Sequence, residues 1–405
     1  MIKIGILTFH RSTNNGALIQ CFALCKQLQT DFPDCIIEVV DYEMPIVKRK
    51  IYPSNAAMYF EGTTVREKIS KIKRFVKNHQ MFKIQREKDR VFKEALRYIP
   101  LSDKYICEDS TSQLFEYINN EYDVIIAGSD AIWNYTVRGF PNPYFLDVSV
   151  QSKKMSYAAS CFGMNYERIP SSEKKKIKNI LDTYSFIGIR DEESRLFLDS
   201  IDCMVQPCHT CDPTVLLDID NLPVDVNQLH SKLIKRGFKF DKTTIGVMGN
   251  DEMCKMVREL YNNKFQIVSL FNYCKHADVN LYDISPFEWA YVFRLFKITF
   301  TTYFHGTLLS LRNGTPVVAI ALKNDYTHAH KSKVEDFLER IGMETCYFNT
   351  DYRGLNYNKI LNKSNELISK DSKKEIFEKL EKEKNGYQLF RKNLNNIIKG
   401  EMKND

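Results

Sequence analysis

Short apolar runs alternate with amphipathic stretches along most of this chain. Continuous runs rich in Val, Ile and Phe are typical of strands buried on both faces, and the stretches between them carry apolar residues at helical spacing. The strand-like runs lie at 2–9, 36–41, 122–127, 153–160, 186–189, 243–249, 265–271, 297–301 and from 316 onward. Such strand and helix alternation predicts parallel sheets joined by crossover helices.

The alternation occurs in two successive series, which predicts two Rossmann-like β/α domains facing a cleft. A chain of 405 residues is too long for one ordinary core, so two domains are also expected from length. We predict an N-terminal β/α domain over 1–220, a C-terminal β/α domain over 221–350 and a helical tail over 351–405. A linker is expected at about 218–241.

Composition narrows the protein class. The longest apolar runs, such as Val317 to Leu322, fall short of the ~20 residues that span a bilayer. The first residues resemble a strand rather than a signal peptide, so a cytoplasmic location is expected. The eleven cysteines then suit small buried side chains in a reducing compartment. Cys208 and Cys211 have C-x-x-C spacing, but no second ligand pair follows, so no metal is expected.

The net charge of +7 is concentrated in one segment. Residues 46–106 contain sixteen Lys or Arg against six Asp or Glu, an excess of ten, so the rest of the chain sums to −3. Apolar residues at helical spacing between Arg66 and Arg97 predict an amphipathic helical insertion. One interpretation is a solvated helix face. The other is a surface for anionic lipid or a lipid-linked acceptor, with the protein peripheral at the inner face of the membrane. Nucleic acid is not expected, because no recognition motif accompanies the charge.

His305 is placed where a strand gives way to a helix. In open α/β sheets, ligands bind at the carboxyl ends of strands, and the N–H groups of Gly306 and Thr307 would face an anion there. The residues therefore suggest a phosphorylated substrate beside an acid–base histidine. The alternative is a histidine that only satisfies its own loop.

Polar residues follow three other predicted strands. The loop 10–16 contains capping residues and leads to Asn15 and Gly16, and a Gly-Ser-Asp turn carries Ser129 and Asp130. These are candidates for acceptor or cleft contacts, or are structural turn and cap residues. Arg190 lies at a strand to helix junction, where it can hold a carboxylate or phosphate bidentately. Its alternative role is a salt bridge to Asp191 or Glu193.

Several short motifs together resemble the polysaccharide pyruvyl transferase family. They are Thr8, Asn15-Gly-Ala-Leu-Ile-Gln20, Ala127-Gly-Ser-Asp-Ala-Ile-Trp-Asn134, Ser156-Tyr-Ala-Ala-Ser160, Ile189-Arg-Asp-Glu-Glu-Ser194, Asp212-Pro-Thr214, Ser285-Pro-Phe-Glu-Trp289 and Phe304-His-Gly-Thr307. Their order and spacing carry the resemblance, which covers residues 1 to about 345. The resemblance implies a fold similar to glycosyltransferase-B and no cofactor. It also implies pyruvate transfer from phosphoenolpyruvate, as a ketal, to a saccharide in cell-surface polysaccharide biosynthesis.

The resemblance also implies roles for particular residues. His305 would act as the acid–base or phosphate-contacting group, and Arg190 would bind the donor anion. Some family members carry an arginine where this chain has Tyr303, which leaves one donor-binding cation to be found. Lys323, or His328 and Lys331 in the following loop, are candidates to replace it.

Two other functions compete with pyruvyl transfer. A glycosyltransferase could bind a nucleotide sugar in the same cleft, with Glu335 or Asp336 holding the ribose. A non-catalytic membrane-surface subunit could dock beside polysaccharide enzymes through the basic segment.

Overall fold

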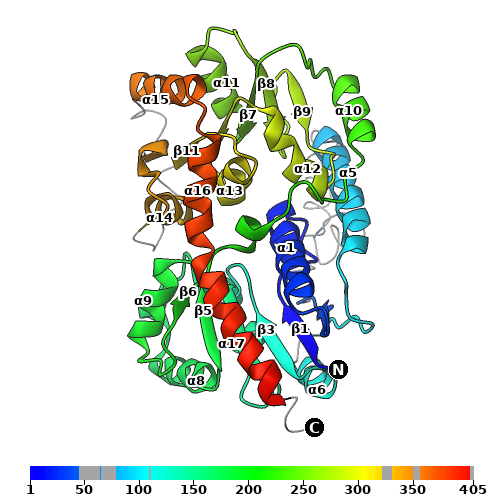
Figure 1. Ribbon diagram of the computed structural model, residues 1–405, viewed down its shortest axis with the longest axis vertical. Helices are drawn as coiled ribbons and strands as arrows, with labels where there is room; N and C mark the ends of the chain where they lie inside the picture. The colour runs from blue at the N-terminus through cyan, green and yellow to red at the C-terminus, as the bar shows by residue number, and fades with distance from the viewer. Residues whose placement is uncertain (45–63, 65–78, 109–110, 322–330, 350–355, 402–405) are drawn as a thin grey trace.

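Two parallel six-stranded sheets, each covered by helices, form the body of the protein (Figure 1). The structure is a computed structural model and describes residues 1–44, 64, 79–108, 111–321, 331–349 and 356–401. The predicted α/β class with two β/α units is confirmed.

The first sheet has the strand order β2-β1-β3-β4-β5-β6. Its strands are β1 (Lys3–Leu7), β2 (Ile36–Val39), β3 (Val124–Ala127), β4 (Lys153–Ala159), β5 (Phe186–Ile189) and β6 (Cys208–His209). The helices that follow or connect these strands are α1 (Asn15–Asp31), α6 (Ser112–Glu121), α7 (Tyr135–Arg138), α8 (Ser171–Leu181) and α9 (Glu192–Ser200). β3 is buried at all four positions, which explains its uninterrupted apolar sequence.

The second sheet has the order β12-β11-β10-β7-β8-β9. Its strands are β7 (Thr244–Met248), β8 (Gln266–Leu270), β9 (Val279–Leu281), β10 (Ile298–Thr301), β11 (Val317–Ala321) and β12 (Tyr347–Asn349). Its helices are α11 (Asp251–Leu260), α12 (Pro286–Val292), α13 (Phe304–Arg312) and α14 (Lys333–Arg340). Ser285 and Glu288 form the capping box that begins α12, as their spacing predicts.

One prediction for the joining regions needs correction. The stretch 218–241, expected as a linker, contains the helix α10 (Val226–Lys235), whose Leu229 and Leu233 are buried. The Cys208 to Cys211 stretch includes the edge strand β6, and its side chains have separate partners. The Cys211 thiol lies 3.3 Å from the Tyr157 hydroxyl, and the His209 ring lies 3.2 Å from the Glu383 carboxylate.

The basic segment lies mostly outside the described residues, which exclude 45–63 and 65–78. Its described part contains α5 (His79–Ala95), where Ile84, Val91 and Phe92 are buried, as an amphipathic helix requires. α5 packs against α12 of the second unit. Within the described parts of the chain, no helix combines the length and apolarity needed to cross a membrane.

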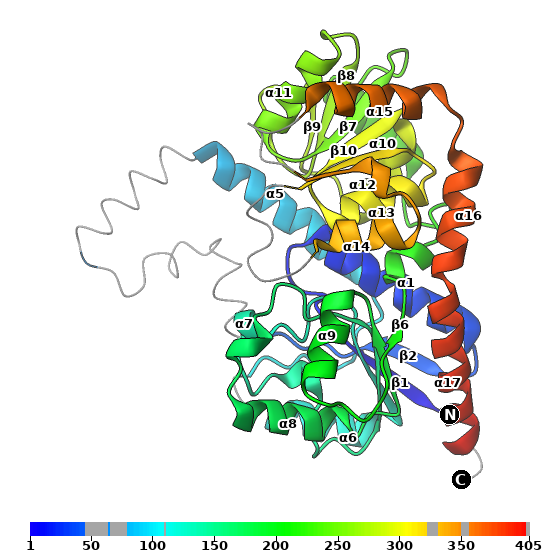
Figure 2. The same ribbon diagram turned by 90° about the vertical axis from the view of Figure 1, so that its left-hand side faces the viewer.

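The C-terminal helices connect the second unit back to the first, as Figure 2 shows. They are α15 (Tyr357–Ser369), α16 (Lys373–Glu383) and α17 (Asn385–Glu401). α16 packs on α13, and α17 packs on β5. The Phe390 and Tyr157 rings pack edge to face, with their centroids 4.8 Å apart, so α17 forms part of the core of the first unit.

Gly386 sets how closely α17 approaches β6. A Cβ atom at this position would lie 2.1 Å from the His209 carbonyl oxygen, and backbone cannot give way as a flexible side chain can. We predict that Gly386→Ala lowers the free energy of unfolding by about 1–3 kcal/mol, the usual cost of overpacking. Chemical denaturation of the full chain measures this.

Gly400→Ala is the matched control, since Gly400 lies in the same helix and a Cβ there meets nothing within 4 Å. This change is expected to be neutral or slightly stabilising, because alanine is the better helix former. Equal effects of the two substitutions would contradict the close approach of α17.

Candidate functional site

The carboxyl ends of β1 and β3 in the first unit lie close to the start of α13 in the second. In each sheet the order in which the strands are added reverses at one pair of parallel neighbours, β1 and β3 in the first sheet and β7 and β10 in the second. Ligands of open α/β sheets bind at these switch points. His305 is the second residue of α13, the helix that follows β10, and its ring lies against Gly16 of α1.

Gly16 is required for this contact. A Cβ atom at position 16 would lie 2.1 Å from Cδ2 of His305, closer than any side chain allows. The N-cap of α1 is Asn14, whose side chain accepts hydrogen bonds from the N–H groups of Gly16 and Ala17. Asn15, predicted as a cap or acceptor contact, is instead the first helical residue. Its role in acceptor binding stays a prediction.

His305 is held neutral and has an unused ring nitrogen. Its Nδ1 atom is buried and has no hydrogen-bond partner among the described residues. Burial lowers the pKa of His305 from its ordinary value, although the nearby carboxylates of Asp212 and Asp130 oppose this effect. A neutral imidazole with a buried free nitrogen can donate or accept a hydrogen bond to a ligand, depending on its tautomer.

Arg190 is fully buried and pairs with two carboxylates. Its Nη1 atom donates to Asp212 at 2.7 Å, and its Nη2 atom donates to Asp130 at 3.4 Å. The predicted alternative partners, Asp191 and Glu193, are therefore wrong as ion-pair partners. Asp191 instead caps α9.

The Arg190 pairing leaves one donor unused. The Nε atom of Arg190 is buried and has no partner among the described residues. The guanidinium therefore has capacity for one further acceptor, and its anion-binding role stays a prediction.

Asp130 is presented by an unusual backbone turn. Its φ of 87° is rare for a residue other than glycine. The preceding Gly128 has a φ of 130°, and a Cβ there would lie 2.0 Å from the Tyr157 carbonyl oxygen. Burial would raise the pKa of Asp130, but the positive charges of Arg190 and Lys333 outweigh it and hold that pKa well below its usual range. Asp130 is therefore ionised.

The carbonyl and the hydroxyl of Ser129, in the same turn, differ in their hydrogen bonding. Its carbonyl oxygen accepts a hydrogen bond from the Thr8 hydroxyl at 3.1 Å. Its own hydroxyl is buried and has no partner among the described residues. The hydroxyl is thus available to a ligand, as the sequence prediction for Ser129 requires.

The first turn of α13 has no side-chain cap. Tyr303 occupies the N-cap position, but its side chain makes no capping hydrogen bond, and it is exposed. Gly306 lies against Thr301, since a Cβ at position 306 would be 2.4 Å from the Thr301 hydroxyl. Thr307 donates its hydroxyl to the Tyr303 carbonyl at 3.3 Å and is buried. Thr307 therefore supports the helix, and the uncapped N–H groups can meet an anion.

Lys333 is a cation near this site that sequence reasoning missed. It is the first residue of α14, and its ammonium lies 4.9 Å from the Phe162 ring of the first unit. Within the described ranges it has no carboxylate at ion-pair distance, whereas Lys331 pairs with Glu339 at 2.5 Å. Burial and the neighbouring Arg190 lower the pKa of Lys333. Of the other predicted cations, Lys323 and His328 lie outside the described residues.

Two cavities contain residues of this charged cluster. One, of about 410 Å³, is lined by Phe9, His10, Arg11, Ser12, Thr13, Asn14, Tyr42, Glu43, Met44, Asp130, Ala131, Arg138 and Tyr144. The other, of about 400 Å³, is lined by Phe162, Thr301, Thr302, Tyr303, Phe304, Ala319, Ile320, Ala321, Ser332, Lys333, Val334 and Tyr347. Both volumes are in the range of small-molecule sites, about 300–1,000 Å³.

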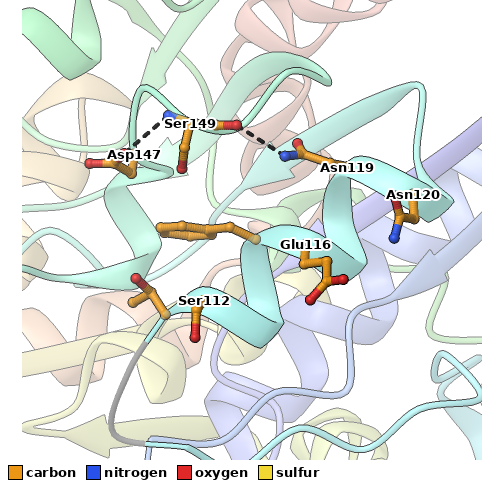
Figure 3. Close-up of a pocket in the computed structure, with 8 residues that line it drawn as sticks. Ser112, Glu116, Asn119, Asn120, Asp147 and Ser149 are labelled. Atoms are coloured by element: carbon orange, nitrogen blue, oxygen red, sulfur yellow. Dashed lines mark hydrogen bonds between the residues drawn. The ribbon is translucent and has the colours of Figure 1, made fainter.

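A third cavity of about 640 Å³ lies between α6 and the loop that follows residue 146 (Figure 3). Asn119, Asp147 and Ser149, which line it, bond to one another. Asn119 donates to the Ser149 carbonyl at 3.0 Å, and the Ser149 N–H donates to Asp147 at 3.0 Å. It shares no lining residue with the cluster around His305, so we assign the candidate site to the other two cavities.

Comparison with solved structures identifies the fold. A glycosyltransferase from Rickettsia africae aligns with a TM-score of 0.52 and 11% identity, covering 98% of this chain and 97% of that chain. UDP-GlcNAc 2-epimerase from Neisseria meningitidis, solved with UDP-GlcNAc, aligns with a TM-score of 0.51 and 11% identity, covering 97% and 99%. The epimerase from Methanocaldococcus jannaschii gives 0.52 and 9%, covering 91% and 93%. The expected glycosyltransferase-B-like fold is thereby confirmed.

Comparison of sequences identifies the family. No curated protein matches the chain significantly in sequence. The family model described as polysaccharide pyruvyl transferase matches residues 14–324, which include Gly16, Asp130, Arg190, Asp212 and His305. The chain therefore belongs to the polysaccharide pyruvyl transferase family.

Proposed function

We propose that this protein transfers pyruvate from phosphoenolpyruvate to a saccharide as a ketal, in the biosynthesis of a cell-surface polysaccharide. The observation that carries the proposal is the buried, unpartnered Nδ1 of His305 at the uncapped start of α13. A helix N-terminus favours an anion, and an imidazole beside it can exchange a proton with that anion or with the carbon skeleton.

The donor has two anionic groups, a phosphate and a carboxylate, and the site has matching positive groups. Lys333 and the first turn of α13 border the same cavity, so they can hold one anionic group together. The unused Nε of Arg190 can contact the other. Lys333 thus supplies the cation that Tyr303 does not.

The reaction needs one proton delivered to the donor and one proton removed from each attacking saccharide hydroxyl. A proton added to the methylene carbon of phosphoenolpyruvate leaves a cationic carbon, which a first saccharide hydroxyl attacks. Loss of phosphate regenerates a cationic carbon, and a second hydroxyl closes the ketal. We assign the first proton to His305, which then accepts one hydroxyl proton, while the departing phosphate takes the other.

His305 must be protonated to begin this sequence, although it is neutral in the free protein. Binding of an anion within about 4–6 Å favours the charged imidazolium and raises its pKa. Binding of the donor would therefore promote uptake of a proton by His305. The ionised carboxylates of Asp130 and Asp212 would stabilise the same imidazolium.

A nucleotide sugar is the alternative donor in this fold. The carboxylates suggested for its ribose already have partners, because Glu335 caps α14 and Asp336 pairs with Arg340 at 2.6 Å. The described residues thus favour phosphoenolpyruvate over a nucleotide, and UDP-hexose serves as the competing ligand in the tests below.

Lys333→Gln should weaken phosphoenolpyruvate binding by about 10–100-fold, because a hydrogen bond to a charged group contributes about 1.5–3 kcal/mol. The measurement is the rise in melting temperature with increasing phosphoenolpyruvate, which follows mass action. Lys331→Gln is the control, since Lys331 lies two residues away and pairs with Glu339. Stabilisation of the unsubstituted protein by UDP-hexose and not by phosphoenolpyruvate would refute the proposed donor.

The affinity for phosphoenolpyruvate should depend on pH through His305. Because the free protein has a lowered His305 pKa and the bound anion raises it, binding takes up a proton. Affinity should therefore increase as pH falls through the pKa of the complex, and level off below the pKa of the free protein. Titration calorimetry between pH 5.5 and pH 8 measures this in the unsubstituted protein and in His305→Gln.

The ionisation of phosphoenolpyruvate itself affects both proteins equally, so the difference between the two pH profiles isolates His305. Parallel profiles would argue against proton uptake by this residue. Turnover should also fall by about 10²–10⁴-fold in His305→Gln, the usual contribution of general acid–base catalysis.

A further inference from the structure

The cavity that follows β1 and β3, here called the β1–β3 cavity, contains two buried polar atoms that have no hydrogen-bond partner among the described residues. Its lining residues are given above, and they come from the loops after β1, β2 and β3, from α7 and from Tyr144. One unpartnered atom is a donor, Nε of Arg138, and the other is an acceptor, Oε1 of Glu43. A buried polar group without a partner costs about 1–3 kcal/mol, so two in one cavity indicate a missing ligand.

Arg138 is a cation without a counter-ion. Its guanidinium carbon lies 3.7 Å from the centre of the Phe9 ring and 5.6 Å from that of Tyr144. Its Nη1 atom contacts the Met44 sulfur at 3.7 Å. Within the described ranges no carboxylate lies at ion-pair distance from Arg138. The stacked rings hold the guanidinium in place while its Nε faces no protein acceptor.

Glu43 is a buried carboxylate that is only half satisfied. Its Oε2 atom accepts a hydrogen bond from the Tyr105 hydroxyl at 2.9 Å, while Oε1 accepts none from the part of the chain that the structure describes. The neighbouring Asp41 differs, because it accepts hydrogen bonds from His10 at 3.0 Å and from Arg11 at 2.5 Å. The open hydrogen-bonding capacity of the cavity is thus concentrated on Glu43 and Arg138.

The charges in the cavity favour a neutral ligand. Arg11 is balanced by Asp41, and Arg138 and Glu43 are of opposite sign. Asp130, the remaining carboxylate, lies at the side shared with Arg190 and repels an anion. A phosphate or carboxylate would meet at least as many acidic groups as arginines here. A polyhydroxylated ring suits this lining, because each hydroxyl both donates and accepts.

We propose that the β1–β3 cavity binds a neutral pyranose ring of the saccharide acceptor. One ring hydroxyl donates to Oε1 of Glu43, and another accepts from Nε of Arg138. The half-buried Phe9 ring packs against the sugar, and Asp130 orients a hydroxyl toward the cluster that includes His305. This inference rests on the proposed function, since it names the second substrate of the same reaction.

The test measures binding of simple sugars rather than turnover. Saturation-transfer NMR with methyl glucopyranoside, galactopyranoside and mannopyranoside at millimolar concentration detects weak binding, with and without phosphoenolpyruvate. We expect at least one glycoside to bind the unsubstituted protein. Arg138→Met and Glu43→Gln should each weaken that binding at least fivefold, while the stabilisation by phosphoenolpyruvate stays unchanged.

Arg195→Met is the matched control, because Arg195 is exposed on α9 and pairs with Glu192 and Asp199 away from the cavity. Glu43→Gln keeps the size of the side chain, so it remains informative if Arg138→Met lowers stability. Thermal unfolding of each variant without ligand checks that it is folded.

Three results would overturn the inference. They are the absence of binding by all three glycosides, binding that neither substitution weakens, and displacement of the bound glycoside by inorganic phosphate. Failure of the proposed function gives a different pattern, in which phosphoenolpyruvate does not stabilise the unsubstituted protein while the glycosides still bind and still depend on Glu43 and Arg138.

Discussion

The approach of His305 to Gly16 is the contact on which the arrangement of the site depends. The imidazole comes from the start of α13 in the second unit, and the glycine comes from the first turn of α1 in the first unit. Because position 16 has no Cβ, the two helix N-termini can come together with only the ring between them. Both helices carry partial positive charge at these ends, so the contact also creates a place where an anion is favoured.

The charges around this contact are balanced in a particular way. Asp130 and Asp212 bind Arg190, and Lys333 lines the cavity at the carboxyl ends of β10 and β11. A buried ion pair contributes little net stability, but removing one partner leaves an uncompensated charge and costs about 3–5 kcal/mol. Arg190 therefore stabilises the fold by neutralising two buried carboxylates, in addition to any role with substrate. Lys333 has no such pairing within the described ranges, and its removal changes the charge of the cavity with less effect on the fold.

The two cavities next to this cluster differ in the ligands that suit them. Counting described residues alone, Lys333 in the cavity at the start of α13 has no counter-ion, whereas the β1–β3 cavity combines one unpartnered donor with one unpartnered acceptor. The proposed anionic donor therefore suits the cavity beside Lys333, and the proposed neutral saccharide suits the β1–β3 cavity. This division follows from local charge and hydrogen-bonding capacity, and it is independent of the distant structural relatives.

The sequence by itself determined the order of the strands and helices, the parallel α/β class, and which strand ends carry polar residues. These features are local, since a buried parallel strand such as β3 is apolar at successive positions. Short edge strands such as β6 and β12 were missed, because two or three residues show no period.

Only the tertiary structure decided which side chains of the site pair with each other. Arg190 pairs with Asp212, 22 residues away, rather than with adjacent Asp191, because the ends of neighbouring strands meet in space. Lys333, at the start of a helix, has the sequence context of a solvated lysine, and packing against Phe162 of the other unit brings it to the site.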